Sequence, residues 1–176
     1  VSNFMAEMGF PRLMPTPDVA PSPQQLHGIE KDDYAHELAQ TTIWIGYIQW
    51  FVKNGYGFPA EPILKPIDSI EHRDAILNPD GTEPDWPECE AIVGNPPFLG
   101  GKKLKRELTD AYVKSVFTLW NKRVRRESDL CCYWFEKARQ QIESGRCQRA
   151  GLLGTQAIRG GANREVLKRV KQTGNI

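Results

Sequence analysis

The chain has 176 residues, enough for one domain with a hydrophobic core, and 40% of them are hydrophobic. No apolar run approaches the roughly 20 residues that span a bilayer, and the first residues lack the basic and apolar segments of a secretory signal. These features argue against a membrane or exported protein, and we expect a cytoplasmic one. None of the four cysteines forms a Cys-x-x-Cys pair, which favours buried free thiols over a zinc site, and we expect no metal.

The net charge of +1 hides a strong asymmetry along the chain. Residues 1–99 carry 15 acidic and 5 basic side chains, whereas residues 100–176 carry 7 acidic and 18 basic ones. Such a split indicates that one side of the molecule faces a polyanion. Basic helix faces that contact only solvent are the alternative.

The chain begins with a proline-rich segment, residues 1–25, which we expect to be an extended connector. Residues 25–30 then predict a short strand that ends in a glutamate. Asp32 or Asp33 can cap the helix that follows, which the apolar spacing predicts over residues 34–52.

Two further strands are expected before the middle of the chain. Alternation within residues 67–75 predicts a strand followed by an acidic turn, and the apolar residues 91–94 predict another. The loop between them, residues 78–88, contains the turn sequence Pro79-Asp80-Gly81.

A basic insertion with helical stretches follows over residues 99–128, and its clearest helix runs over residues 104–119. Ser128 or Asp129 can cap the next helix, which we expect over residues 130–144.

The last elements are a buried strand over residues 150–155 and a helix over residues 164–172. The whole order predicts an α/β fold with a mostly parallel sheet, in which ligands bind at the carboxyl ends of the strands. Three of these ends carry conspicuous polar residues, Glu30, Asp74 and Asn95.

The most informative motif is Asn95-Pro96-Pro97-Phe98, directly after a predicted strand. The Asn95 side-chain oxygen and the Pro96 carbonyl can both accept hydrogen bonds from one exocyclic amino group. The two prolines lack N–H donors and have a fixed φ, so they hold that carbonyl outward, while the Phe98 ring can stack on a base. A methyltransferase acting on the amino nitrogen of adenine needs this arrangement, although the motif can also arise as a chance turn.

The two acidic residues are weaker signals when each is taken alone. Glu30 suits a carboxylate that accepts both ribose hydroxyls of a nucleoside cofactor, but a helix-capping or surface role is favoured for a lone acid at a strand end. Asp74, followed by Ala75, can accept from the amino group of a cofactor adenine, with the same alternative.

Several stretches together resemble a known family: Gly28-Ile29-Glu30, residues 42–46, 94–104, 129–135 and 151–153, and residues 158–164. The chain resembles the adenine-specific DNA methyltransferases that use S-adenosylmethionine. Within them it is most similar to the methyltransferase part of single-chain type II restriction-modification enzymes and to related phage-defence methylases. The resemblance extends over nearly the whole chain from about residue 24.

The resemblance implies a Rossmann-like class I methyltransferase sheet and a role for each motif residue. The implied cofactor-binding residues are Ile29, Glu30, Asp74 and Ala75, and the implied catalytic residues are Asn95, Pro96, Pro97 and Phe98. Asn95 and Pro96 would hold the target amino group, and Phe98 would stack on the flipped base. The partner is then double-stranded DNA, whose phosphates we expect to contact Lys102, Lys103, Lys105, Arg106, Arg159 and Arg164.

The resemblance also implies the domain organisation. Residues 26–176 would be a partial catalytic domain, with a cofactor half over residues 26–98 and a basic, DNA-facing half over residues 99–176. The first strand with its glycine-rich loop is expected before Val1, and the last strands and a target-recognition domain after Ile176. We therefore expect an incomplete sheet and an isolated chain that is inactive; relatives of this kind often carry a nuclease domain upstream.

Two other functions remain open at this stage. The same motif occurs in enzymes of this fold that methylate RNA bases or protein glutamine, although the basic insertion favours DNA. The chain could also be a DNA-binding fragment without activity.

Overall fold

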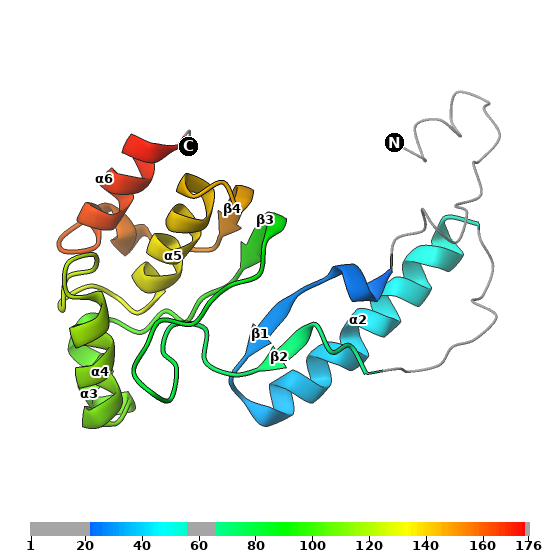
Figure 1. Cartoon of the computed structure of the whole chain (residues 1–176), viewed down its shortest axis with the longest axis horizontal. Helices are drawn as coiled ribbons and strands as arrows, with labels where there is room; N and C mark the ends of the chain where they lie inside the picture. Colours follow the sequence, from blue (N-terminus) through cyan, green and yellow to red (C-terminus); the bar gives the residue numbers. More distant parts are fainter. Residues whose placement is uncertain (1–21, 56–65, 175–176) are drawn as a thin grey trace. The chain divides into compact units, whose positions relative to one another are not determined.

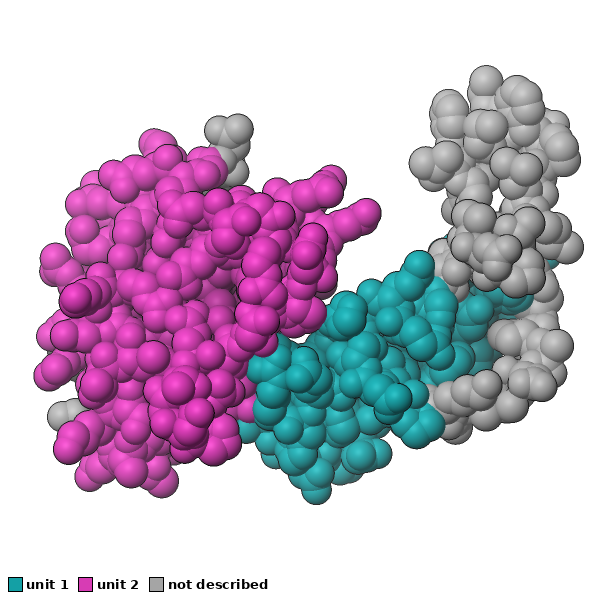
Figure 2. Space-filling model, viewed as in Figure 1, with its two compact units in different colours: residues 1–73 teal, residues 74–176 magenta. Residues whose placement is uncertain are grey.

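The structure, a computed structural model, describes residues 22–55 and 66–174 (Figure 1). Most of the expected connector over residues 1–25 lies outside this range. The chain divides into two compact units, Val1–Arg73 and Asp74–Ile176, shown in different colours in Figure 2. Each unit contains a pair of parallel strands with a helix packed on it, α2 (Asp33–Lys53) in the first and α5 (Cys131–Glu143) in the second, and we describe each by itself.

In the first unit, strands β1 (Gly28–Glu30) and β2 (Ile70–His72) pair in parallel, with Glu30 opposite His72. A short 3₁₀ helix, η1 (Pro23–Gln25), precedes β1, and the long helix α2 (Asp33–Lys53) packs against both strands (Figure 1). The strand that was predicted to end at Glu30 is confirmed.

Helix α2 begins and ends where the sequence signals place it. The Asp32 side chain accepts a hydrogen bond of 2.9 Å from the Ala35 amide, which satisfies one of the unpaired N–H groups at the helix start. At the other end Asn54 is the C-cap, and Gly55 follows with φ of 80°, a conformation that favours glycine. His36 fixes the helix to the sheet through a 2.8 Å hydrogen bond between its Nε2 and the Ile70 carbonyl.

In the second unit, strands β3 (Cys89–Gly94) and β4 (Cys147–Leu152) pair in parallel, from Cys89 opposite Cys147 to Gly94 opposite Leu152. Helix α5 (Cys131–Glu143) packs against β4, and helix α6 (Arg164–Thr173) packs against α5. The predicted α/β class with parallel pairing is confirmed. The described strands form two two-stranded sheets, β1–β2 and β3–β4, instead of one continuous sheet.

The basic insertion folds as two helices, α3 (Gly101–Glu107) and α4 (Asp110–Trp120), so the prediction of one helix over residues 104–119 is wrong. The break has a local cause. Thr109 has an extended backbone, and its side chain accepts from the Tyr112 amide at 3.3 Å, so it starts a new helix.

Two further details differ from the sequence-based expectation. Neither Ser128 nor Asp129 caps α5, whose N-cap is Leu130 without a side-chain hydrogen bond, because the Asp129 carboxylate is bonded elsewhere. Strand β4 begins at Cys147, three positions before the predicted start, and residues 148–151 are exposed, not buried. Arg146 explains the early start: it is anchored to Asp85 and to the Trp86 carbonyl, both at 2.6 Å, so the chain is already alongside the segment before β3.

Large aromatic side chains form the core of the second unit. Trp120 and Tyr133 are both 0% exposed, and their rings meet edge to face with centroids 5.7 Å apart. The indole N–H of Trp120 donates to the Ile76 carbonyl at 3.0 Å, so this buried donor is satisfied. Within the described ranges, no helix combines the length and apolar character needed to cross a membrane.

Candidate active site

The Asn-Pro-Pro-Phe segment begins directly where β3 ends. The Gly94 carbonyl accepts from the Leu153 amide at 2.9 Å, so pairing with the neighbouring strand continues up to the last residue before Asn95. Pro96 is buried, whereas Asn95 and Pro97 are exposed. The buried proline anchors the segment, and the residues on either side of it face outward.

Asn95 and Phe98 present binding groups at this strand end. The Asn95 side chain is exposed and makes no hydrogen bond to any residue in the described part of the chain, so its oxygen can accept from a ligand. Phe98 is 50% exposed, although a phenyl ring gains free energy when it leaves water. An acceptor and an apolar ring three residues apart can bind a flat group that carries an amino substituent.

The chain just beyond Phe98 is fixed to the segment before α5. The Leu99 carbonyl accepts from the Leu130 amide at 2.8 Å, and the Gly101 amide donates to Asp129 Oδ1 at 3.2 Å. A Cβ atom at residue 101 would lie 2.5 Å from the Glu127 carbonyl oxygen, so only glycine fits there.

Asp74, the expected partner of a cofactor adenine, lies in a defined network. Its Oδ1 accepts from the amides of Ile76 at 2.9 Å and Leu77 at 3.2 Å. Its Oδ2 accepts from the hydroxyl of Tyr112, on α4, at 2.8 Å. Ala75 is buried, and its carbonyl accepts from the Trp86 indole N–H.

Tyr112 is a site residue that the sequence did not single out. Burial, reinforced by the charge and hydrogen bond of Asp74, raises its pKa well above the ordinary value. The phenol therefore stays protonated and donates to the carboxylate. No local pattern marks this role, because the two residues are 38 positions apart.

Glu30 ends β1 as predicted, and one of its oxygens has a local role. Oε1 accepts from the Lys31 amide at 2.7 Å and from the Asp32 amide at 2.8 Å, which shapes the turn into α2. Oε2 makes no hydrogen bond to the described residues. Ile29 lies in the middle of β1, opposite Glu71. Both belong to the first unit, whereas Asp74, Ala75 and the Asn95 segment belong to the second.

The predicted DNA-binding residues lie on three elements of the second unit. Lys103 and Arg106 are exposed on α3, and Arg106 forms an ion pair of 2.8 Å with the adjacent Glu107. Arg159 ends the 3₁₀ helix η2 (Gln156–Arg159) and Arg164 begins α6, and both are exposed. Lys102 and Lys105 also belong to α3, but their side chains lie outside the described part.

Not every basic residue of the second unit is available to a polyanion. Arg123 is bonded to Glu83 at 2.5 Å and to Gln140 at 2.8 Å, and its guanidinium lies 4.1 Å from the centroid of the Trp120 ring. This arginine therefore links parts of the fold, whereas its neighbours Lys122 and Arg125 are exposed.

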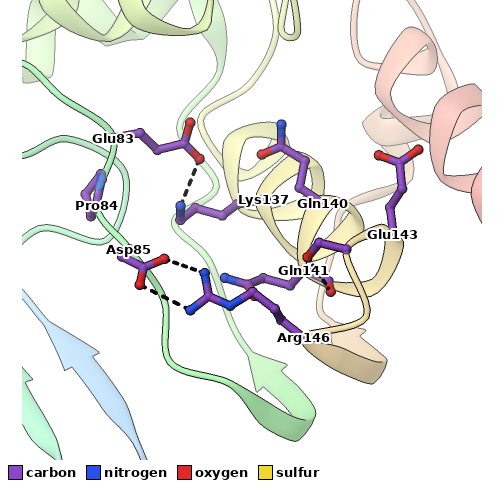
Figure 3. A pocket seen from close by; sticks show the side chains of 9 residues that line it. Glu83, Pro84, Asp85, Lys137, Gln140, Gln141, Glu143 and Arg146 are labelled. Atoms are coloured by element: carbon purple, nitrogen blue, oxygen red, sulfur yellow. Dashed lines mark hydrogen bonds and ion pairs between the residues drawn. The ribbon is translucent and has the colours of Figure 1, made fainter.

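A cavity of about 420 Å³ lies near the amino ends of β3 and β4, whereas the Asn95 segment follows the carboxyl end of β3 (Figure 3). Its charged walls are paired, Lys137 with Glu83 at 2.8 Å and Arg146 with Asp85 at 2.6 Å. Since Asn95 follows the carboxyl end of β3, this cavity is not the candidate active site.

The charges beside this cavity hold the unit together. Burial raises the pKa of Glu83, but the hydrogen bonds from Arg123 and Lys137 outweigh it, so the pKa lies below the ordinary 4.5. Burial lowers the pKa of Lys137 against the opposite effect of Glu83. We expect the pair to be ionised, because Arg123 supplies a second cation to the same carboxylate.

Comparisons with known proteins found one matching family and one similar protein. The sequence matches the family described as MmeI, DNA-methyltransferase domain, over residues 14–174. It is also similar to the Bacillus subtilis (strain 168) protein named DNA methyltransferase A, with 32% identity over 93 residues.

That similarity covers 47% of this chain and 10% of the Bacillus protein, so the chain corresponds to a small part of this relative's length. No solved structure matches the chain. The predicted resemblance to DNA methyltransferases is confirmed, and the chain belongs to the MmeI DNA-methyltransferase domain family.

Proposed function

We propose that the full-length protein transfers a methyl group from S-adenosylmethionine to the N6 amino group of an adenine in double-stranded DNA. The observation that carries this proposal is the exposed Asn95, without a hydrogen-bond partner in the described chain, between the end of β3 and the half-exposed Phe98. Family membership supports the methyltransferase chemistry and DNA as the substrate. We further propose that the protein acts in the cytoplasm, within a restriction-modification or phage-defence system.

The two acceptors solve a problem of nucleophilicity. The lone pair of the adenine amino nitrogen is delocalised into the ring, which makes it a poor nucleophile. Asn95 Oδ1 and the Pro96 carbonyl accept from its two hydrogens, draw the nitrogen toward tetrahedral geometry and localise the lone pair. S-adenosylmethionine, when bound, supplies the electrophilic methyl group. Catalysis then depends on positioning and electrostatics.

Phe98 has a separate task in this mechanism. A base inside a duplex cannot reach the end of β3, so the adenine must leave the helix and lose its stacking. The exposed face of the Phe98 ring replaces part of that stacking. Asn95 and Phe98 thus act on the same base, one on its edge and one on its face.

We further propose that the two acidic residues bind the nucleoside part of S-adenosylmethionine. Oε2 of Glu30 can accept from ribose hydroxyls, because only Oε1 is used in the turn. The Asp74 carboxylate, held by Tyr112, can accept from an adenine amino group. Ile29 and Ala75 supply apolar neighbours. For the DNA backbone we propose contacts by Lys102, Lys103, Lys105, Arg106, Arg159 and Arg164.

The test expresses the full-length protein in a host without DNA methylation and identifies the modified nucleosides of its DNA by mass. We expect N6-methyladenine with the wild type and a loss of at least about 100-fold with Asn95→Ala, because two transition-state contacts depend on this loop. Binding of S-adenosylmethionine, measured by calorimetry, should change less than about threefold.

Asn121→Ala is the matched control, because Asn121 is an exposed asparagine at the end of α4, and it should leave methylation unchanged. Equal loss of methylation and cofactor binding in Asn95→Ala would refute the role given to Asn95. A wild type that modifies no DNA base would move the acceptor to RNA or protein glutamine, or show an inactive DNA-binding protein.

A further inference from the structure

Two polar residues outside the Asn-Pro-Pro-Phe motif form a reciprocal pair. The Asp129 amide donates to Asn163 Oδ1, and Asn163 Nδ2 donates to Asp129 Oδ2, both at 2.8 Å. Asn163 is only 7% exposed, so these hydrogen bonds are shielded from water. The pair joins the segment before α5 to the residue that precedes α6.

The bonding around Asn163 requires an amide side chain. Its Oδ1 also accepts from the Cys132 thiol at 3.4 Å, and its Nδ2 also donates to the Ala157 carbonyl at 3.2 Å. Both donors and both acceptor positions of the amide are therefore used. An aspartate of the same shape would keep the acceptors and lose both donors.

The second oxygen of Asp129 reaches the chain beside the proposed catalytic residues. Oδ1 accepts from the Gly101 amide at 3.2 Å, three residues after Phe98. Helix α3 begins at Gly101, and its N-cap Gly100 has no side chain, so Asp129 supplies a side-chain acceptor for an otherwise unpaired N–H of the first turn. Asn163 orients Asp129, and Asp129 holds the start of α3.

Residues 95–101 are thus fixed at both ends. The upstream end is held by the Gly94 carbonyl bond to Leu153 and by burial of Pro96. The downstream end is held by Asp129 and by the Leu99 carbonyl bond to Leu130. Without the bond to Asp129, the downstream end of this segment loses one of its two anchors, and Asn95 and Phe98 are held less firmly.

We propose that Asp129 and Asn163 are positioning residues that set the geometry of Asn95 and Phe98 during methyl transfer, an inference that rests on the proposed function. Neither residue touches the reacting atoms in this assignment. A displacement of about 1 Å at a reacting group can lower the rate about 100-fold. The pair should therefore affect kcat more than it affects cofactor binding.

The first variant of the full-length protein is Asn163→Asp, which removes both donors and sets a second carboxylate against Asp129. We expect kcat to fall about 10- to 100-fold, with the KM for S-adenosylmethionine changed less than about threefold. Asp129→Asn keeps an oxygen that accepts from the Gly101 amide, but it sets its own NH2 group against the NH2 group of Asn163. This variant should show the same pattern of kcat and KM. It provides a second test should Asn163→Asp fail to fold.

The rescue variant exchanges the pair, Asp129→Asn with Asn163→Asp. The new amide at 129 can donate to the new carboxylate at 163, and its oxygen still faces the Gly101 amide. We expect kcat at least about tenfold above that of Asn163→Asp alone. Unchanged kcat in both single variants, or equal loss of kcat and cofactor binding without rescue, would overturn the proposal.

A measurement independent of methylation separates this inference from the proposed function. In hydrogen exchange followed by mass, the Gly101 amide should exchange faster in Asn163→Asp and return toward the wild-type rate in the exchanged pair. Asn95→Ala should leave it unchanged. Faster exchange in a protein that makes no N6-methyladenine would refute the proposed function and leave the hold of Asp129 and Asn163 on Gly101 in place. Unchanged exchange would refute that hold itself.

Discussion

Tyr112 connects the basic insertion to the proposed cofactor site through a hydrogen bond to Asp74. Its hydroxyl donates to Asp74 Oδ2 at 2.8 Å, while Oδ1 of the same carboxylate is held by the amides of Ile76 and Leu77. The carboxylate is therefore oriented from two sides. Of these contacts, only the bond from Tyr112 comes from a distant part of the chain.

Tyr112→Phe removes this hydroxyl and keeps the ring. We expect the Kd for S-adenosylmethionine to rise about five- to tenfold, because a typical protein hydrogen bond contributes about 0.5–1.5 kcal/mol. Calorimetric titration of the full-length protein measures the change. Tyr34→Phe, which alters a tyrosine that is 77% exposed, is the control; equal affinities for the wild type and Tyr112→Phe would contradict the role of the hydroxyl.

From the sequence, residue roles that depend on neighbouring residues could be predicted, whereas roles that depend on contacts between distant residues could not. Asn95, Pro96 and Phe98 form a contiguous motif whose chemistry can be derived from the side chains themselves. Tyr112 and Asn163 could not be found in this way. Their roles depend on contacts with residues 38 and 34 positions away, and no local pattern records such a distance.

At the scale of elements, local signals placed the boundaries of α2 well, but not those of α3 and α4 or the N-cap of α5. Asp32 and the Asn54-Gly55 pair determine both ends of α2 through capping bonds within four residues of each end. Strand β4 was misplaced for the opposite reason. Its start depends on Arg146 reaching Asp85, which lies 61 positions earlier.

Glu83 offers a test of how the elements of the second unit are joined. It accepts from Arg123, just after α4, and from Lys137 on α5, and these bonds keep its pKa below the ordinary 4.5. A lowered folded-state pKa means that the stabilisation is present above about pH 4.5. It is lost as the pH falls through the lowered pKa.

Glu83→Gln should therefore be less stable than the wild type near neutral pH, by about 1–3 kcal/mol. It should also lose less stability than the wild type on acidification below about pH 4.5. Thermal unfolding of both proteins over a pH series measures the difference. Glu143→Gln changes an exposed carboxylate paired with Arg139 on the same helix and should cost at most about 0.5 kcal/mol. Parallel pH curves for Glu83→Gln and the wild type would contradict the assignment.

At the scale of the whole molecule, the charge asymmetry along the sequence separates the proposed ribose-binding residue from the proposed DNA-binding residues. The proposed ribose-binding residue Glu30 belongs to the acidic first half, and α3 and α6 belong to the basic second half. The structure also divides the basic residues by role. Arg123 is bonded within the fold, whereas Lys103 and Arg106 are exposed.

This division predicts the salt dependence of DNA binding. For each phosphate contact, the logarithm of the binding constant falls by about 0.9 per unit of the logarithm of salt concentration. The double variant Lys103→Gln with Arg106→Gln should reduce that slope by about 1.8. Fluorescence anisotropy with a duplex over a salt series gives the slopes. Lys171→Gln, at an exposed lysine of α6, should leave the slope unaltered, and an unaltered slope in the double variant would exclude α3 from the interface.

The pairing of β3 with β4 has a consequence for the order in which a newly synthesised chain folds. Glu90 and Cys147 are 57 positions apart, so β3 is synthesised well before its partner strand exists. Helices α3 to α5 are synthesised in between and can form from local contacts, whereas the parallel pair must close a long loop. Asn163 is made later still. The segment around Asn95 is therefore translated early but can reach its final geometry only after Asn163 has been made.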